Sequence, residues 1–209
     1  NAVLFNNGFL AALRYFSFDI IDRKMLQVNT SGTDFTQASL KSYYRKIDFP
    51  RQTAYWAQRV LAKRNSLLIF SSLIEEAMQT ARLIDGAVVL TGDTEKRERE
   101  NILSRFKAGK IKCLVNVGVL TTGFDYPALE AVLIAKSTMS LAFYYQVIGR
   151  VMRPYTYEDG SKKEGWVIDL GNNINFFGKI ETMQIVENSN GLYSVMNNGR
   201  HLTNVTFSK

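Results

Sequence analysis

The sequence predicts an α/β fold in which a parallel sheet is sandwiched between helices, with a small β-hairpin appended near the carboxyl end. Short apolar runs alternate with stretches of helical periodicity, which is typical of parallel strands joined by crossover helices. The runs are apolar at both odd and even positions, as expected for strands that are buried on both faces. Near the end of the chain, two further apolar runs flank a turn segment rich in Asn and Gly.

These observations divide the chain into three parts. A lead-in segment, 1–65, contains a candidate strand at 16–21 and a helix that starts at Pro50, and we expect it to pack on the central domain. The central domain, 66–171, contains the predicted strands 67–70, 87–90, 113–117, 131–135 and 166–170, with helices near 72–84, 94–108 and 140–153. The C-terminal extension, 172–209, contains a predicted hairpin formed by 183–187 and 192–196.

Composition limits the class of protein. The chain has 209 residues, of which 46% are hydrophobic, so it can form one domain with appendages. Lys and Arg (26) exceed Asp and Glu (19), which is compatible with nucleic acid or another polyanion as a partner. The single cysteine, Cys113, excludes an internal disulfide framework, and the single His201 lies in no ligand cluster, so we expect no metal site. With no signal peptide and no membrane span apparent, we expect a cytoplasmic protein with no membrane partner.

The segment 146–154 carries the most informative pattern. On the last predicted helix, Gln146, Gly149, Arg150 and Arg153 have the spacing i, i+3, i+4 and i+7 and therefore share one face, while the opposite face is apolar. Two guanidinium groups on an open face suit a polyphosphate, because each binds phosphate oxygens bidentately and keeps its charge. The alternative is a surface helix with two solvated arginines.

Two loops follow predicted strands at their carboxyl ends, where parallel sheets bind ligands. The loop 118–127 offers backbone amides and hydroxyl groups to phosphate oxygens. In this loop Asp125 can accept hydrogen bonds from ribose hydroxyls, or it can cap the turn before a proline. The shorter loop Thr91-Gly92-Asp93 follows another strand.

The segment 41–64 combines basic and aromatic residues, a pattern that can bind single-stranded nucleic acid through phosphate contacts and stacking. We favour the alternative, in which the aromatic side chains belong to the core and the charged ones to the surface.

Together, these segments resemble the C-terminal RecA-like motor domain of superfamily II helicases over residues 66–154. Motif IV is matched by the Leu-Leu-Ile-Phe-Ser-Ser run, motif V by the loop after the third predicted strand, and motif VI by Gln-Val-Ile-Gly-Arg-Val-Met-Arg-Pro. The residues of motifs V and VI most resemble those of DNA repair helicases and of the motor subunits of type III restriction enzymes. Thr122 stands where such relatives often carry an acidic residue, and Val117 stands where DEAD-box proteins carry a threonine, so contacts that need those groups are not transferred.

The resemblance implies that the chain contributes to an ATP site. Arg150 and Arg153 match the motif VI arginines that face the γ-phosphate, and Arg153 would be the arginine finger. Gly123, Asp125 and Gln146 match positions near the nucleotide, with Asp125 toward the ribose.

The resemblance also implies a second group of residues that contacts the phosphates of a nucleic-acid strand. This group consists of Ser71, Thr91, Gly92, Val117, Gly118 and Thr121.

The sequence contains neither a P-loop pattern nor an Asp-Glu-x-His/Asp box. We therefore expect ATP and Mg²⁺ to be held mainly by a preceding N-terminal RecA-like domain of the same polypeptide. The expected function is that of the second motor domain of an ATP-dependent helicase or translocase, inactive alone, acting on nucleic acid and on DNA rather than RNA. The alternatives are a non-catalytic nucleic-acid-binding module with a degenerate motor fold, a restriction-enzyme motor subunit, and half of a doubly wound metabolic enzyme.

Overall fold

The main sheet has six strands, all parallel, in the order β1-β6-β5-β2-β4-β3. The structure, a computed structural model, describes residues 2–120, 124–203 and 208. The strands are β1 (Ala12–Ser17), β2 (Leu67–Ser71), β3 (Val88–Leu90), β4 (Cys113–Asn116), β5 (Ala131–Ala135) and β6 (Glu164–Asp169). The predicted α/β fold class is confirmed.

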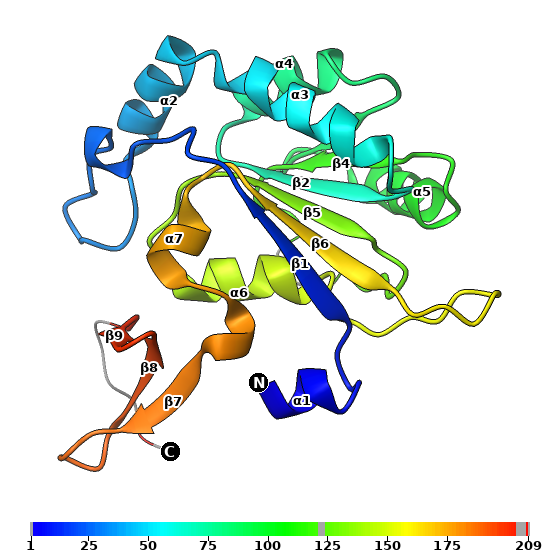
Figure 1. The fold of residues 1–209 in the computed structure, drawn as a ribbon. Coiled ribbons are helices and arrows are strands. Elements are labelled where there is room, and N and C mark those ends of the chain that lie inside the picture. Colours follow the sequence, from blue (N-terminus) through cyan, green and yellow to red (C-terminus); the bar gives the residue numbers. More distant parts are fainter. Residues whose placement is uncertain (1, 121–123, 204–207, 209) are drawn as a thin grey trace.

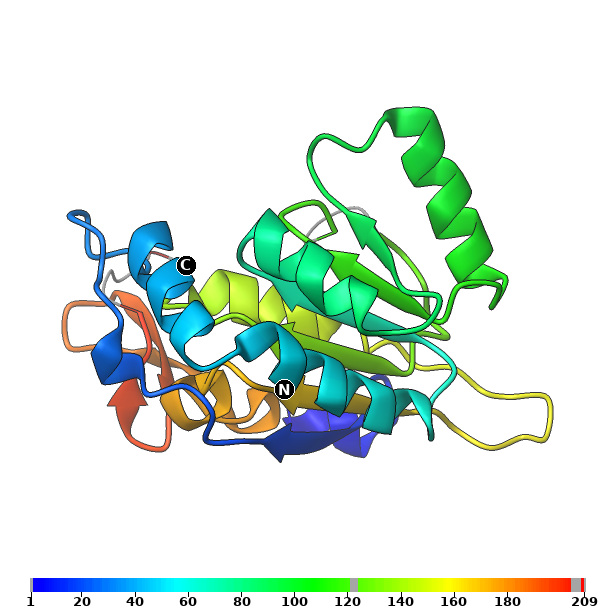
Figure 2. The ribbon, with the colours of Figure 1, turned by 90° about the horizontal axis from the view of Figure 1, so that it is seen from above.

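Helices cover both faces of this sheet (Figures 1 and 2). One face is covered by α2 (Gln37–Lys46), α3 (Phe49–Leu61) and α4 (Ile74–Arg82). The other face is covered by α5 (Lys96–Lys107), α6 (Leu141–Gly149) and the short α7 (Asn173–Phe177). The described residues also form three short helices, α1 (Ala2–Asn6), η1 (Arg23–Met25) and η2 (Ile180–Thr182).

The central strands are buried on both sides. In β2, Leu68 and Phe70 belong to the core beneath α6, whereas Leu67 and Ile69 belong to the core beneath α3. Because side chains alternate across a strand, this two-sided burial requires apolar residues at both parities. Each such side chain stabilises the fold by roughly 1.5–3 kcal/mol when fully buried.

The lead-in segment contributes the edge strand β1 to the main sheet. Its six residues pair in register with β6, from Ala12 opposite Glu164 to Ser17 opposite Asp169. The strand predicted at 16–21 is therefore placed too late. Sequence patterning missed the true start because an edge strand tolerates polar residues, and here the Arg14 guanidinium forms an ion pair with Glu164 at 3.1 Å.

The helix predicted to continue to Arg153 ends earlier than expected. Helix α6 stops at Gly149, and the amides of Arg150 and Val151 donate to carbonyls three residues back, at 3.2 and 3.0 Å. Glycine is a weak helix former, and the residue before Pro154 is disfavoured in the α region. Arg153 therefore does not share a helical face with Gln146 and Arg150, and this part of the prediction is wrong.

The C-terminal extension forms a small antiparallel sheet. It consists of β7 (Gln184–Glu187), β8 (Tyr193–Asn197) and β9 (Arg200–His201), so the predicted hairpin is present and has an additional short strand. Across the described ranges, no helix has the length and apolar character that crossing a bilayer requires.

Glu76 of α4 provides a test of this fold by pH. The residue is 8% exposed, and burial raises the pKa of its carboxyl from 4.5 to about 7. The folded chain thus holds this proton more tightly than the unfolded chain, so its contribution to stability is present at low pH and is lost as pH rises through 7. We expect Glu76→Gln to remove a loss of roughly 3 kcal/mol between about pH 4.5 and pH 8, as measured by urea unfolding. A substituted chain with the same pH profile as the original would contradict this assignment.

Candidate functional site

Three strands end side by side at the carboxyl edge of the sheet. The ladder places Ser71, Val117 and Thr91 at equivalent positions, because each directly follows a pair of residues in register. The backbone amide of Val117 also donates to the carbonyl of Leu90 at 2.9 Å. The fold therefore brings together candidate residues that lie far apart in the sequence.

The loop after β3 is held by its own polar groups. The Thr91 amide donates to Thr94 Oγ1 at 3.1 Å, the Asp93 amide donates to Thr91 Oγ1 at 3.2 Å, and the Arg99 guanidinium donates to the Thr94 carbonyl at 3.1 Å. Gly92 is exposed, and a Cβ at this position would meet no atom within 4 Å. The loop thus presents accessible backbone for a phosphate to approach.

Asn116 shapes the loop after β4, and the sequence analysis did not single it out. The side chain is 1% exposed, and its Oδ1 accepts hydrogen bonds from the amides of Val119 (3.2 Å) and Leu120 (2.9 Å). Gly118, at φ +72°, adopts the left-handed conformation that favours glycine. The signal in the sequence is a polar residue that ends an otherwise apolar strand.

Two other candidates in this loop, Thr121 and Gly123, lie outside the described residues.

Both motif VI arginines contact the segment that leads into β5. Arg150 Nη1 donates to the Phe124 carbonyl at 2.6 Å, and Arg153 Nη1 donates to Asp125 Oδ1, also at 2.6 Å. Burial, and then the charge of Arg153, lower the pKa of Arg150, while Asp125 opposes this shift. The arginines thus lie close to Asp125 although they do not share a helix.

This arrangement can bind a polyphosphate. The side chains of Arg153 and Asp125 are 50% and 58% exposed, so the guanidinium remains accessible. The Asp125 carboxylate now supplies the anionic oxygen that the guanidinium binds. A phosphate oxygen can replace it there. Gln146 is exposed on α6, one helical turn before Arg150. Within the described ranges, no group of three or more His, Cys, Asp or Glu residues is placed to hold a metal ion.

Two residues that the sequence analysis missed fix the same segment from the loop after motif VI. Lys163, 3% exposed, donates from Nζ to the Pro127 carbonyl at 2.5 Å, and burial lowers its pKa to about 8. Tyr157 Oη donates to Glu130 Oε1 at 2.9 Å. Together they hold the stretch that carries Asp125 against the start of β6.

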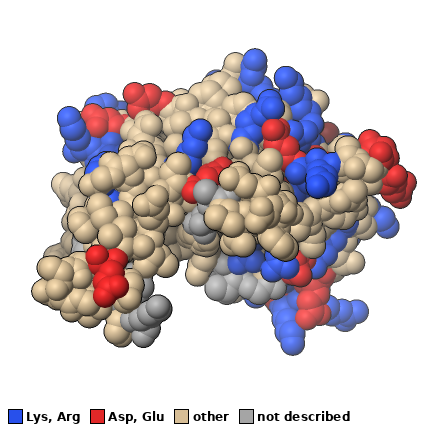
Figure 3. Space-filling model, turned by 60° about the horizontal axis from the view of Figure 1, so that its bottom comes forward, with Lys and Arg blue, Asp and Glu red and all other residues tan. Residues whose placement is uncertain are grey.

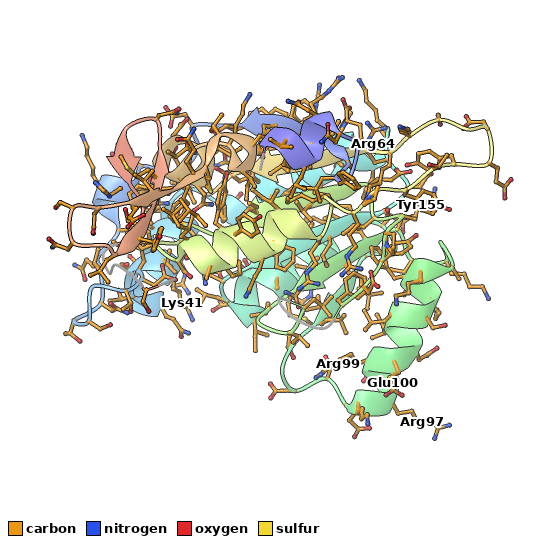
Figure 4. All side chains as sticks on the ribbon, turned by 90° about the horizontal axis from the view of Figure 1, so that it is seen from below. Lys41, Arg64, Arg97, Arg99, Glu100 and Tyr155 are labelled. Atoms are coloured by element: carbon orange, nitrogen blue, oxygen red, sulfur yellow. The ribbon has the colours of Figure 1, made fainter. Side chains whose placement is uncertain are left out.

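Basic side chains do not form one continuous patch on the face drawn in Figure 3. They lie there in several separate groups, with acidic side chains among them. In Figure 4, Lys41 of α2 lies at the left of the view, whereas Arg97 of α5 lies at the lower right. Within the segment 41–64, Tyr44 is buried in the core, whereas Tyr55 is 51% exposed and accepts a hydrogen bond from the Arg59 guanidinium at 2.9 Å.

Several known proteins are similar to this chain. Residues 53–155 match the model of the helicase conserved C-terminal domain family. A candidate ATP-dependent helicase of Saccharomyces cerevisiae, IRC3, is 37% identical over 145 residues, which cover 66% of this chain and 21% of that protein. A 51.5 kDa protein of a Lactococcus phage is 27% identical over 154 residues, covering 72% of this chain and 33% of that protein. The chain thus spans about a fifth to a third of the length of these relatives.

Among solved structures, a fragment of a candidate HsdR subunit of a type I restriction enzyme from Vibrio vulnificus has a similar fold. The TM-score is 0.61 at 22% sequence identity, and the match covers 82% of this chain and 34% of that chain. At this identity the similarity concerns the fold alone.

Proposed function

The chain belongs to the C-terminal motor domain family of superfamily II, ATP-dependent helicases, and from this premise we propose that it is the second motor domain of a DNA helicase or translocase, with DNA repair as its expected setting. The observation that carries the proposal is the pair of arginines, Arg150 and Arg153, both bound to residues 124–125.

In the proposed mechanism, ATP lies between this chain and an N-terminal RecA-like domain of the same polypeptide, which supplies most of the contacts to ATP and Mg²⁺. Arg153 would leave the Asp125 carboxylate and contact the γ-phosphate when the two domains close. A guanidinium there stabilises the charge that spreads over the transferring phosphoryl group. Asp125, once released, would accept hydrogen bonds from the ribose, while Arg150 and Gln146 would contact the phosphates and link them to the nucleic-acid site.

The proposed nucleic-acid track lies at the carboxyl edge of β2, β4 and β3. The Gly92 amide and the hydroxyl groups of Ser71 and Thr91 would contact successive phosphates, beside Val117 and the loop that begins at Gly118 and includes Thr121. Closing and opening of the two domains would then move this track along the strand. We propose the reducing cytoplasm as its location, because the single cysteine, Cys113, cannot form a disulfide within the chain.

We expect the 209-residue chain alone to bind single-stranded nucleic acid in a salt-dependent manner and to show no ATP turnover above background. The longer polypeptide, with its N-terminal motor domain, should hydrolyse ATP, and single-stranded DNA should stimulate it more than RNA. Phosphate release by both proteins, with and without each nucleic acid, measures this.

Robust turnover by the chain alone would overturn the proposed division of the active site. Salt-dependent binding without turnover in the longer polypeptide would instead identify a non-catalytic binding module. Stronger stimulation by RNA would contradict the proposed DNA substrate.

A further inference from the structure

A groove of about 450 Å³ adjoins the proposed nucleic-acid track. It is lined from three parts of the chain: Gln37, Ala38 and Lys41 of α2; the stretch 72–75 that follows β2; and Val117. Val117 belongs to the proposed track, and residue 72 directly follows Ser71 of the same track. The groove is therefore continuous with the track and extends it toward the lead-in segment.

The structure holds α2 at this edge of the sheet. Asp34, just before the helix, accepts hydrogen bonds from the Met139 amide at 2.9 Å and from Thr138 Oγ1 at 3.0 Å, both beyond the carboxyl end of β5. The Thr36 side chain caps the helix by accepting from the Ser39 amide at 3.2 Å. Figures 1 and 2 show α2 lying beyond the sheet at the end from which the lead-in segment departs.

The charged groups in the groove form an exposed pair. Lys41 Nζ lies 2.5 Å from Glu75 Oε2, and the two side chains are 50% and 47% exposed. Lys41 lowers the pKa of Glu75, and Arg45 on the next turn of α2 lies 3.7 Å from the same carboxylate. An ion pair this exposed is screened and is readily exchanged for another anion.

The lining favours a sugar–phosphate backbone over a base. Among the described residues that line the groove, none has an aromatic side chain on which a base could stack. They do include an ammonium group and a side-chain amide, which suit phosphate oxygens.

We propose that helix α2 extends the nucleic-acid track, with Lys41 contacting a phosphate of the single strand next to those bound at Val117 and Ser71. Gln37 hydrogen-bonds to the backbone of the same strand. Glu75 competes with that phosphate for Lys41 and so weakens binding. This inference rests on the proposed function, and it gives the lead-in segment a direct role in holding the strand.

The test measures how tightly the full 209-residue chain binds fluorescein-labelled oligo(dT) and oligo(U). Fluorescence anisotropy follows the binding over a series of salt concentrations. We expect Lys41→Ala to weaken binding about fivefold and to reduce the salt slope by about 0.7, as for the loss of one single-strand phosphate contact. Glu75→Gln should have the opposite effect and tighten binding about threefold, because it removes the competing charge. Lys46→Ala is the matched control, since it removes the same charge from the exposed last turn of α2, outside the groove lining.

Three outcomes separate this inference from the proposed function. If the unmodified chain binds neither oligonucleotide, the proposed track itself is wrong. If Thr91→Ala weakens binding while the Lys41 and Glu75 variants behave like Lys46→Ala, the track stands and its extension along α2 is overturned. Equal losses for Lys41→Ala and Lys46→Ala would also overturn the extension, because they would reflect overall charge alone. Circular dichroism melting curves verify that each variant is folded.

Discussion

Arg153→Ala is expected to lower ATP turnover of the proposed two-domain polypeptide by about 10³-fold or more while leaving the fold intact, because the proposed role of Arg153, that of an arginine finger, contributes on the order of 10³–10⁵ in rate. The fold should tolerate the change, since the Arg153 side chain is 50% exposed and its ion pair is with the equally exposed Asp125. Arg153→Lys should restore little activity. A lysine keeps the charge but cannot form the bidentate contact with phosphate oxygens.

The measurement is steady-state turnover at saturating nucleic acid, together with the melting temperature of each variant. Arg51→Ala provides a control, because the Arg51 side chain on α3 is also exposed, at 78%, and pairs with Asp48 at 3.0 Å, away from the motif VI segment. Unchanged turnover in Arg153→Ala would remove the finger assignment. A loss that appears only together with a lower melting temperature would indicate a structural role instead.

The sequence predicted strands β2, β4 and β5 well and the edge strand β1 poorly. Strands β2, β4 and β5 lie within one residue of their predicted ends, because two-sided burial leaves an uninterrupted apolar run. Strand β1 is only partly buried, so its pattern is mixed and the apolar run that follows it was mistaken for the strand. The end of α6 was misplaced for a different reason, since an apolar pattern continued past Gly149 although the backbone did not continue as a helix.

For the candidate site, the sequence predicted the residues that lie in local motifs but not the distant residues that hold them in place. Local motifs identified Arg150, Arg153 and Asp125, and the structure places all three together. The partners that hold them could not be read from the sequence, because they depend on tertiary packing. The Phe124 carbonyl that receives Arg150 carries no side-chain signal, and Lys163 reads as a surface lysine beside Lys162 although the fold buries it.

Asp169→Ala is expected to destabilise the fold by about 3–5 kcal/mol, because it leaves buried donors without an acceptor. Asp169 ends β6 with none of its surface exposed, and its carboxylate accepts from the amides of Gly171 (3.0 Å), Asn173 (2.5 Å) and Ile174 (2.7 Å). A fourth hydrogen bond comes from Asn173 Nδ2 at 2.8 Å. Burial raises the pKa of this carboxyl, and these hydrogen bonds oppose the shift.

The effect should extend beyond β6, because Asn173 also hydrogen-bonds to residues outside this strand. Its Oδ1 accepts from the Thr138 amide at 3.0 Å and from Arg23 Nη1 at 3.1 Å, which joins the end of β5 and the lead-in segment to the same network. Arg23 is partly buried, and the charge of Asp169 is the largest factor that opposes the lowering of its pKa by burial. Removal of the carboxylate therefore also leaves a desolvated guanidinium with one counter-charge fewer.

Urea unfolding at neutral pH measures this prediction, with Asp159→Ala as control, because the Asp159 carboxylate lies in an exposed turn and accepts from Ser161 of the same turn. Asp169→Asn keeps the fold measurable if the alanine variant does not fold. The amide retains one acceptor oxygen, so its unfolding midpoint should lie between those of the original chain and Asp169→Ala. The network fixes Thr138 just before α6, and Arg150 and Arg153 follow the other end of that helix. We therefore expect Asp169→Asn in the proposed two-domain polypeptide to reduce ATP turnover as well, at denaturant concentrations near the unfolding midpoint of the variant. An Asp169→Ala midpoint equal to that of Asp159→Ala would contradict the central place of this carboxylate in the fold.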